Sequence, residues 1–286
     1  MKMKILLSFF VLLPIIILSQ EKKLELLPSG LQFMPLKANH QEARVGILYY
    51  PKNGYLKVDI GNNIDLIKFR VDSDLELNMG IEFMAYALST NYQGRRLQID
   101  ALDGFFGGNV SMSYKLENSS VKSRLRIIHN SAHFVDGHYD FINNHWKNNI
   151  NPIPFTQDFG ELTLSHFVTY NSLRLQYFGS VAYSTLVRPS LIKKYSFNAG
   201  FEISSGEILG EFLGKETNLF YANYNRYAGM PDYKISTNNV FGIKFGEWEG
   251  KGIILYFSYY FGNDIMSEYY YKRENKFGIG FFVDFF

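Results

Sequence analysis

The chain has no cysteine among its 286 residues. Disulfide bonds and thiolate metal sites are therefore excluded. It also lacks a dominant charge, because 29 lysines and arginines nearly balance 27 aspartates and glutamates. Since no basic patch stands out, we expect no nucleic-acid partner. After residue 20, no stretch approaches the roughly 20 apolar residues that a membrane helix needs.

Aromatic residues are abundant instead. Tyrosine (21) and phenylalanine (26) supply most of a 17% aromatic content, and there are 24 glycines. Mean hydropathy is nevertheless slightly polar, at −0.12. This combination is typical of a transmembrane β-barrel, in which one strand face meets lipid, the other meets a polar interior, and aromatic belts lie at the interfaces. A β-sandwich would have a similar composition, so the strand patterns must decide.

Residues 1–19 have the pattern of a signal peptide. Lys2 and Lys4 give a positive start, and residues 5–18 are mostly apolar. Ser19 precedes the expected cleavage point, so the mature chain would be exported. The alternative is a retained anchor, for which the apolar run is short. The cysteine that a lipoprotein signal requires is missing.

The last eleven residues have strict period-two alternation, which predicts a β-strand. One face carries Phe277, Ile279, Phe281, Val283 and Phe285, and the other carries Gly278, Gly280, Phe282 and Asp284. An apolar strand that ends the chain on an aromatic residue is typical of the closing strand of a membrane barrel. Phe286 resembles the sorting signal read by the outer-membrane assembly machinery, which we therefore expect as a partner. Asp284 departs from the usual apolar pattern, and an edge strand of a soluble sheet is the alternative.

Similar alternation recurs along the chain, with almost no helical periodicity. The segment 75–88 is apolar at alternate positions, and its other face is polar or charged. That charged face suits a wet interior better than a dry sandwich core. Counting such runs predicts an all-β fold, an antiparallel transmembrane β-barrel of about 12 strands. We place the barrel at 44–286.

The segment 20–43 is irregular in pattern, with prolines and glycine interrupting apolar residues. We expect it to be an N-terminal periplasmic lead-in. The alternative is a plug at the mouth of the barrel. The barrel and this segment account for the whole chain after the signal peptide, so the sequence predicts one structural domain.

One strand carries candidate chemistry. One of its faces holds Arg124, Arg126, Ile128, Asn130 and Ala132, and the other holds Leu125, Ile127, His129, Ser131 and His133. Arginines are costly against lipid and natural in a polar interior, so the second face should meet lipid. The long polar segment 134–160 follows, and long loops of such barrels are extracellular. We therefore expect His129, Ser131 and His133 near the outer membrane surface.

This arrangement resembles outer-membrane phospholipase A and the outer-membrane lipid A deacylase, in which a serine nucleophile is activated by a histidine. The resemblance implies that Ser131 is the nucleophile and His129 its base, with His133 as a further candidate. Acyl transfer also needs an orienting group and an oxyanion hole. Location alone suggests these candidates for the orienting group: Asp136, Asp140, Asn143, Asn144 and Glu161. Ala132-His133 follows the serine where those families carry a different polar continuation.

The stretch 102–140 is also similar to a family of predicted bacterial outer-membrane proteins known only as a domain of unknown function. Its hallmark is a basic strand followed by His-x-Ser-x-His and an acidic residue. That resemblance implies a barrel and makes the histidines and serine a family feature. It implies no activity.

Three roles stay open at this stage. The first is an outer-membrane β-barrel that serves as a structural element, a recognition surface or a small channel. The second is a lipid acyl hydrolase that uses Ser131 and His129, although the polar strand end could also simply contact headgroups and water. The third is a ligand-binding or pore barrel that passes small polar solutes through a lumen lined by Glu76, Glu82, Arg124 and Arg126. We expect no cofactor, although calcium would suit a hydrolase. A divalent metal in the loop with Asp136, His138, Asp140 and His145 is less expected than a solvated loop. The lipid bilayer is the expected partner, and a homodimer is a further option.

Overall fold

The computed structural model describes residues 24–92, 96–134, 139–140, 142–146 and 149–285. The predicted signal peptide, 1–19, lies outside these residues. Within the part of the chain that is described, no helix is both long enough and apolar enough to cross a membrane.

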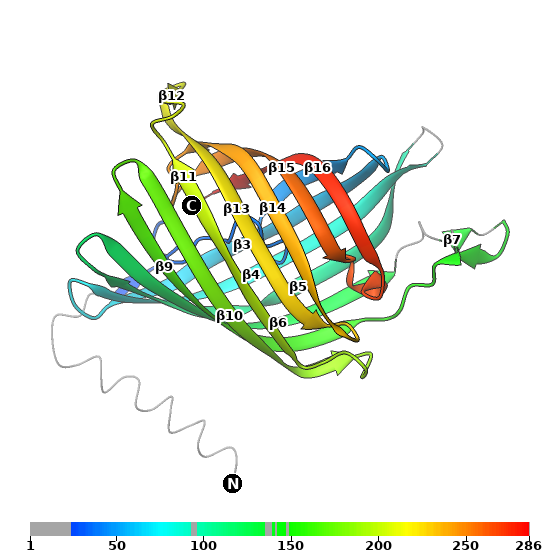
Figure 1. Ribbon diagram of the computed structural model, residues 1–286. Helices are drawn as coiled ribbons and strands as arrows, with labels where there is room; N and C mark the ends of the chain where they lie inside the picture. Colours follow the sequence, from blue (N-terminus) through cyan, green and yellow to red (C-terminus); the bar gives the residue numbers. More distant parts are fainter. Residues whose placement is uncertain (1–23, 93–95, 135–138, 141, 147–148, 286) are drawn as a thin grey trace, which may run out of the picture.

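Twelve antiparallel strands close into a barrel, as the alternation predicts (Figure 1). They are β2 (Val45–Tyr50), β3 (Tyr55–Arg70), β4 (Leu75–Tyr92), β5 (Arg96–Lys115), β6 (Ser119–Phe134), β9 (Thr156–Tyr170), β10 (Leu173–Arg188), β11 (Tyr195–Ser205), β13 (Lys215–Gly229), β14 (Tyr233–Gly246), β15 (Gly252–Asn263) and β16 (Arg273–Asp284). Each strand pairs with its neighbour in the chain, and β16 pairs with β2 to close the ring. Closure leaves few free backbone groups at the edges of the sheet.

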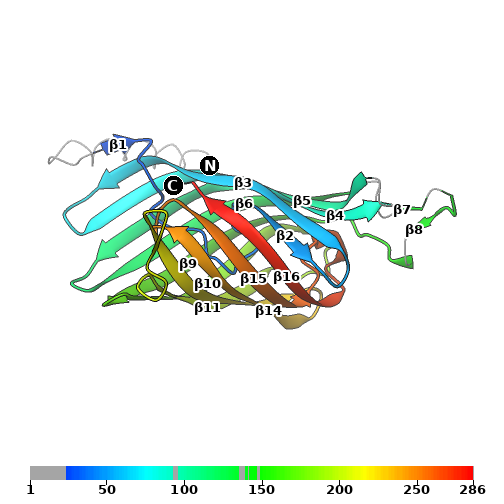
Figure 2. The same ribbon diagram turned by 90° about the horizontal axis from the view of Figure 1, so that it is seen from above.

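The two ends of the barrel differ. Short turns such as 171–172 lie at the end where β16 finishes. The opposite end, hereafter the loop end, carries the segments 135–155 and 264–272. The first contains the small hairpin of β7 (Tyr139–Asp140) and β8 (His145–Trp146), which projects beyond the wall (Figure 2). The loop after β6 is shorter than predicted, because β9 begins at Thr156.

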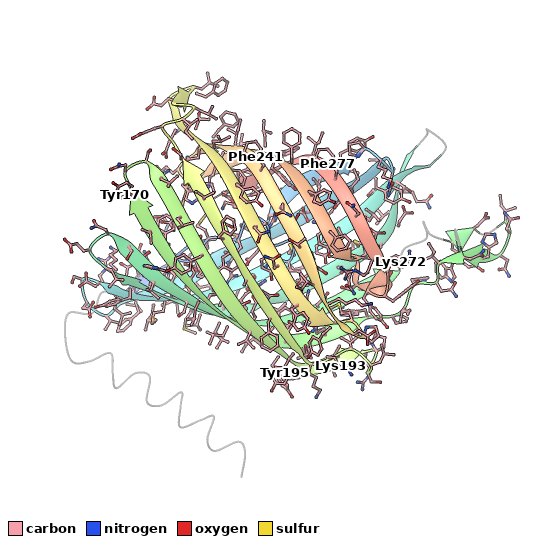
Figure 3. The ribbon with its side chains drawn as sticks, viewed as in Figure 1. Tyr170, Lys193, Tyr195, Phe241, Lys272 and Phe277 are labelled. Carbon is pink, nitrogen blue, oxygen red and sulfur yellow. The ribbon has the colours of Figure 1, made fainter. Side chains whose placement is uncertain are left out.

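Apolar side chains cover the outer surface. Phe241 on β14 and Phe277 on β16 point away from the barrel (Figure 3) and are 49% and 47% exposed. On the predicted apolar face of the last strand, Phe277, Ile279, Phe281 and Phe285 are likewise exposed and Val283 is half-buried, whereas Asp284 is buried inside. Along β4, Met79, Ile81 and Phe83 are exposed outside and Asn78 and Glu82 are buried inside, as predicted. Such an exterior is what a barrel wall in lipid requires.

The interior is filled by the chain's own N-terminal segment. After β1 (Leu24–Leu26), which pairs with residues 67–69 near the end of β3, the chain turns inward. Residues 27–44, hereafter the plug, then run inside the barrel, and most of residues 33–44 are buried. Over its described residues, the segment 20–43 is therefore not the expected periplasmic lead-in. It corresponds to the alternative, a plug, and lies inside the barrel.

Candidate functional site

Ion pairs hold the plug to the inner wall. Glu42 accepts hydrogen bonds from both terminal nitrogens of Arg124 on β6, one of them at 3.0 Å, and both side chains are essentially inaccessible to solvent. Arg126, on the same strand face, donates to Glu82 at 2.8 and 2.9 Å and to Glu161 at 3.4 Å. Of the charges predicted to line the interior, Glu82, Arg124 and Arg126 are thus paired inside it, whereas Glu76 pairs with the exposed Arg70 of neighbouring β3. Buried arginines without such partners would be costly.

Further contacts join the plug to several other strands of the barrel. The backbone N–H of Lys37 donates to Glu202 on β11 at 2.5 Å, and its ammonium lies 3.2 Å from Asp284 on β16. The carbonyl of Ala38 accepts from Asn238 on β14 at 2.8 Å. Strands on opposite sides of the ring therefore bind one short segment.

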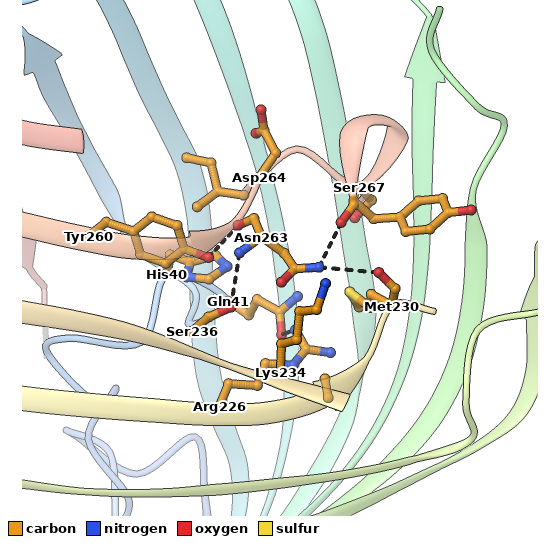
Figure 4. Close-up of a pocket in the computed structure, with 13 residues that line it drawn as sticks. His40, Gln41, Arg226, Met230, Lys234, Ser236, Tyr260, Asn263, Asp264 and Ser267 are labelled. Carbon is orange, nitrogen blue, oxygen red and sulfur yellow. Dashed lines mark hydrogen bonds between the residues drawn. The ribbon is translucent and has the colours of Figure 1, made fainter. Parts of the chain in front are cut away.

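Among the described residues, small cavities lie between the deeper part of the plug and the wall, and a larger open space of about 1340 Å³ borders Ser29 and Gly30 at the end where β16 finishes. One of the small cavities, of about 30 Å³, is lined by His40 and Gln41 of the plug together with Arg226, Tyr260 and Asn263 (Figure 4). A water molecule needs about 10–15 Å³ of such volume, so this cavity holds one or two waters and no solute. Asp264, Ile265, Ser267 and Tyr270 of the loop 264–272 also line this cavity.

That loop is fixed to the inner wall by Asp103 of β5. The carboxylate accepts from the N–H and hydroxyl of Ser267 at 2.9 and 2.6 Å and from the hydroxyl of Tyr86 at 3.1 Å. Glu268, next in the loop, is buried, and burial followed by the nearby charge of Asp103 raises its pKa to about 7. The loop end therefore carries a carboxyl that is partly protonated near neutral pH.

The predicted histidine and serine residues lie on the outer wall. His129, Ser131 and His133 alternate along β6 toward the loop end, opposite in orientation to the buried Arg124 and Arg126. The face prediction for this strand is confirmed by the burial of its two arginines. The outward position follows from strand geometry, because residues two apart share a face.

His129 has an acidic partner on the neighbouring strand. Its Nδ1 lies 2.5 Å from a carboxylate oxygen of Asp158, which is its register partner on β9. Its ring also packs 4.9 Å from that of Phe106 on β5. Engagement of Nδ1 by a carboxylate leaves Nε2 for proton transfer, which is the orientation that a histidine base needs.

Ser131 is hydrogen-bonded to a different histidine from the one predicted. Its Oγ lies 3.0 Å from Nε2 of His133, and its predicted base, His129, is held by Asp158. The three predicted residues are therefore together, but their pairing differs from the expectation. Ser131 lies between the two histidines on one strand face, and its hydrogen-bond partner is His133.

The orienting group was missed by the sequence analysis. Glu161, a predicted candidate, faces the interior and bonds Arg126 and Asn198. Asp140 accepts from Asn143 within the loop, and Asp136 lies outside the described residues. Asp158 lies three residues before the inward-facing Glu161, and residues an odd number apart on a strand lie on opposite faces, so Asp158 faces outward. Its position beside His129 depends on the register between β6 and β9.

An oxyanion hole is not evident from the backbone next to Ser131. The N–H of Ala132 donates to the carbonyl of Phe155 at 3.1 Å and is therefore engaged. Among the described residues, no group of three or more histidine, aspartate or glutamate side chains is placed to hold a metal. His138, part of the metal alternative, lies outside them.

Comparisons with known proteins assign no role to this chain. No family model matches the chain, and no curated protein matches it. Among solved structures, the β-domain of the Bordetella autotransporter BrkA is 11% identical, with a TM-score of 0.42, covering 85% of this chain and 97% of that chain. The toluene transporter TodX of P. putida is 10% identical, with a TM-score of 0.42, covering 93% and 77%. Salmonella typhi OmpF in complex with daunomycin is 9% identical, with a TM-score of 0.33, covering 85% and 96%. At these low identities and TM-scores, no activity of these proteins can be assigned to this chain.

Proposed function

We propose that this chain is a bacterial outer-membrane β-barrel that is closed by its own N-terminal segment. It acts through its outer wall and loops, as a structural or recognition element, and not as an open pore. The membrane location is supported by the closed hydrogen-bond ladder together with an apolar exterior, the combination that lets strands cross lipid. The observation that carries the closed state is the buried pair of Glu42 and Arg124.

Conductance in planar bilayers tests the closed state. Refolded protein should show no steady open level. Truncation through residue 43 should produce open channels, because it removes β1 and nearly all of the plug and keeps the twelve strands of the ring. Steady conductance of the full chain would overturn the proposal. Membrane fractionation and the gel mobility of unheated samples test insertion separately.

If the truncated chain does not fold, a milder variant keeps the test informative. Glu42→Gln with Lys37→Gln removes two charges that hold the plug and leaves the wall sequence intact. We expect brief openings in this variant. The exposed pair of Lys122 and Glu249 offers the control, since Glu249→Gln leaves the plug contacts unchanged.

A second function is favoured by the outward pairs on β6, and we propose it as an alternative. His129 with Asp158, beside Ser131 with His133, provides a serine, two histidines and an orienting carboxylate near the loop end. These groups suit hydrolysis of a lipid acyl ester. The serine oxygen attacks the ester carbonyl, and a histidine accepts the serine proton and passes it to the departing lipid alcohol. Water then cleaves the acyl-serine ester, which releases the fatty acid and regenerates the serine. The substrate would be a phospholipid or lipopolysaccharide acyl chain.

Acyl-chain release tests the alternative. Folded protein is incubated with phospholipid and with lipid A micelles, with and without calcium, beside Ser131→Ala. Release that Ser131→Ala abolishes supports a hydrolase. Loss of a general base lowers such rates by roughly 10²–10⁴-fold, so His129→Ala and His133→Ala show which histidine acts. No release from folded protein under any of these conditions leaves the residues as headgroup contacts.

A further inference from the structure

A cluster of polar side chains interrupts the apolar exterior. Tyr221, Asn223 and Asn225 lie on the outward face of β13, and Thr237 and Asn239 lie on that of β14. We call these five residues the asparagine patch. Asn223 and Asn239 are register partners close to the middle of their strands. The middle of a barrel strand lies at the depth of the bilayer core.

The surroundings of the patch are those of a lipid-facing wall. Its register neighbours on β11 and β15 are aromatic: Phe201 beside Asn223, Tyr259 beside Asn239 and Phe261 beside Thr237. These three rings are themselves exposed on the outer surface. Isolated polar groups within such a band are energetically unfavourable.

Internal hydrogen bonds satisfy part of the patch. Asn239 Oδ1 accepts from Tyr221 at 2.7 Å and from Asn223 at 2.9 Å. Asn223 Oδ1 accepts from Asn225 at 2.5 Å. Asn225 Nδ2 also reaches the carbonyl of Ala199 on β11 at 3.4 Å. The side chains therefore form one connected network on the surface.

One donor and one acceptor are left over. Among the hydrogen bonds of the described residues, none uses Nδ2 of Asn239 and none uses Oδ1 of Asn225. Hydrocarbon offers no partner to either group, so leaving them unsatisfied is costly. An occupant that supplies one acceptor and one donor at this spacing would satisfy both.

We propose that this occupant is a second copy of the chain. In a twofold dimer, Asn239 of one copy donates to Asn225 of the other, and the reciprocal bond follows by symmetry. Side-chain amides associate membrane segments in this way. The proposal rests on the proposed membrane embedding, because in water the same groups would simply be hydrated.

The wall next to the patch allows close approach. Ala199 on β11 and Gly179 on β10 continue the register row of Asn225, and both are exposed. Small residues let two surfaces come near enough for the amides to meet. The row is flanked by Phe197 and Phe201, which would pack against the opposite copy.

Cysteine cross-linking tests the dimer, because the natural chain has no cysteine. Thr237→Cys places a thiol between Asn225 and Asn239, close to the proposed twofold axis. In lipid bilayers, oxidation should give a cross-linked dimer. Ile81→Cys on β4, across the barrel and equally outward, should give none.

A leucine variant tests the hydrogen bonds. Asn225→Leu with Asn239→Leu should weaken dimerisation in bilayers by roughly tenfold or more, since two interchain bonds are lost. The barrel itself should still fold, because leucine suits a lipid-facing position. Asn62→Leu, which removes another exposed asparagine on β3, should leave the dimer unchanged.

The outcomes separate this proposal from the one on which it rests. Inserted barrels that stay monomeric at all protein-to-lipid ratios would overturn the dimer and leave the membrane embedding intact. Cross-linking through Ile81→Cys in place of Thr237→Cys would place the interface elsewhere and overturn the patch. Failure to insert, seen by gel mobility and protease access, would overturn both. A dimer lost only in the double leucine variant supports the patch.

Discussion

Asp284 shows how a single residue can depart from a pattern for a reason that lies elsewhere. In the closing strand it faces inward, where its carboxylate accepts from the ammonium of Lys244 at 2.6 Å and lies 3.2 Å from that of Lys37. The outward neighbours in the strand remain apolar. A membrane barrel can hold charge on its inner face when the charge is paired, and here the plug and β14 supply the partners.

At the same scale, Glu42 should be far more important than a surface partner. Glu42→Ala leaves Arg124 buried without its carboxylate, which should cost about 3–5 kcal/mol of unfolding free energy. Glu249→Ala breaks a solvent-exposed pair with Lys122 and should cost about 0–1 kcal/mol. Urea unfolding in micelles, followed by tryptophan fluorescence, measures both. Equal losses would show that the plug is not held by its charges.

At the scale of elements, register gives the strands of the wall their precise contacts. Gly107 on β5 lies where β6 comes close, so a Cβ there would be 2.0 Å from the carbonyl oxygen of Ile127 and 2.9 Å from the side chain of Ile128. Gly104, three residues earlier, would place its Cβ at an ordinary 3.8 Å from Ser131. The two glycines therefore have different tolerance to substitution.

We expect Gly107→Ala to lower the yield of folded barrel sharply, because the clash is with backbone and forces β5 and β6 apart. Gly104→Ala should fold with normal yield. The fraction of protein with folded gel mobility, measured before heating, compares the two. Normal folding of Gly107→Ala would show that the strands separate more easily than their register implies.

The loop 264–272 should respond to pH through Glu268. Its pKa in the folded protein is raised to about 7 from an ordinary value of 4.5, so the closed loop favours the protonated carboxyl. Its contribution to stability is therefore complete below the unfolded pKa and is lost as pH rises through about 7. Hydrogen exchange of this loop, corrected for intrinsic rates, should speed up across that range. Glu268→Gln should flatten the profile; an unchanged profile would assign the effect to another group.

At the scale of the whole molecule, closure depends on a short contact. The first wall strand, β2, pairs with β16 over residues 45–49 only, whereas β4 and β5 pair over most of their length. The plug precedes β2 directly, so the same segment fills the interior and starts the strand that closes the ring. Interior filling and closure are thereby coupled.

A disulfide across that contact should strengthen the barrel as a whole. Ile47 and Phe281 are register partners, and paired strand positions lie within disulfide reach. Ile47→Cys with Phe281→Cys should form a bond on oxidation and raise the temperature at which the folded gel band disappears. The same chain with reductant serves as its control. No shift on oxidation would indicate that unfolding begins elsewhere.

The sequence by itself determined the barrel, its approximate strand number and which side chains of β4, β6 and β16 face outward. These follow from period-two alternation, which is a local property of each strand. Only the tertiary structure decided that residues 27–44 fill the interior, that Asp158 stands beside His129, and that Asn225 and Asn239 meet on the outer wall. Each of these depends on the register between strands or on a contact across the ring. Alternation carries no information on either, because it is unchanged when neighbouring strands slide by two residues.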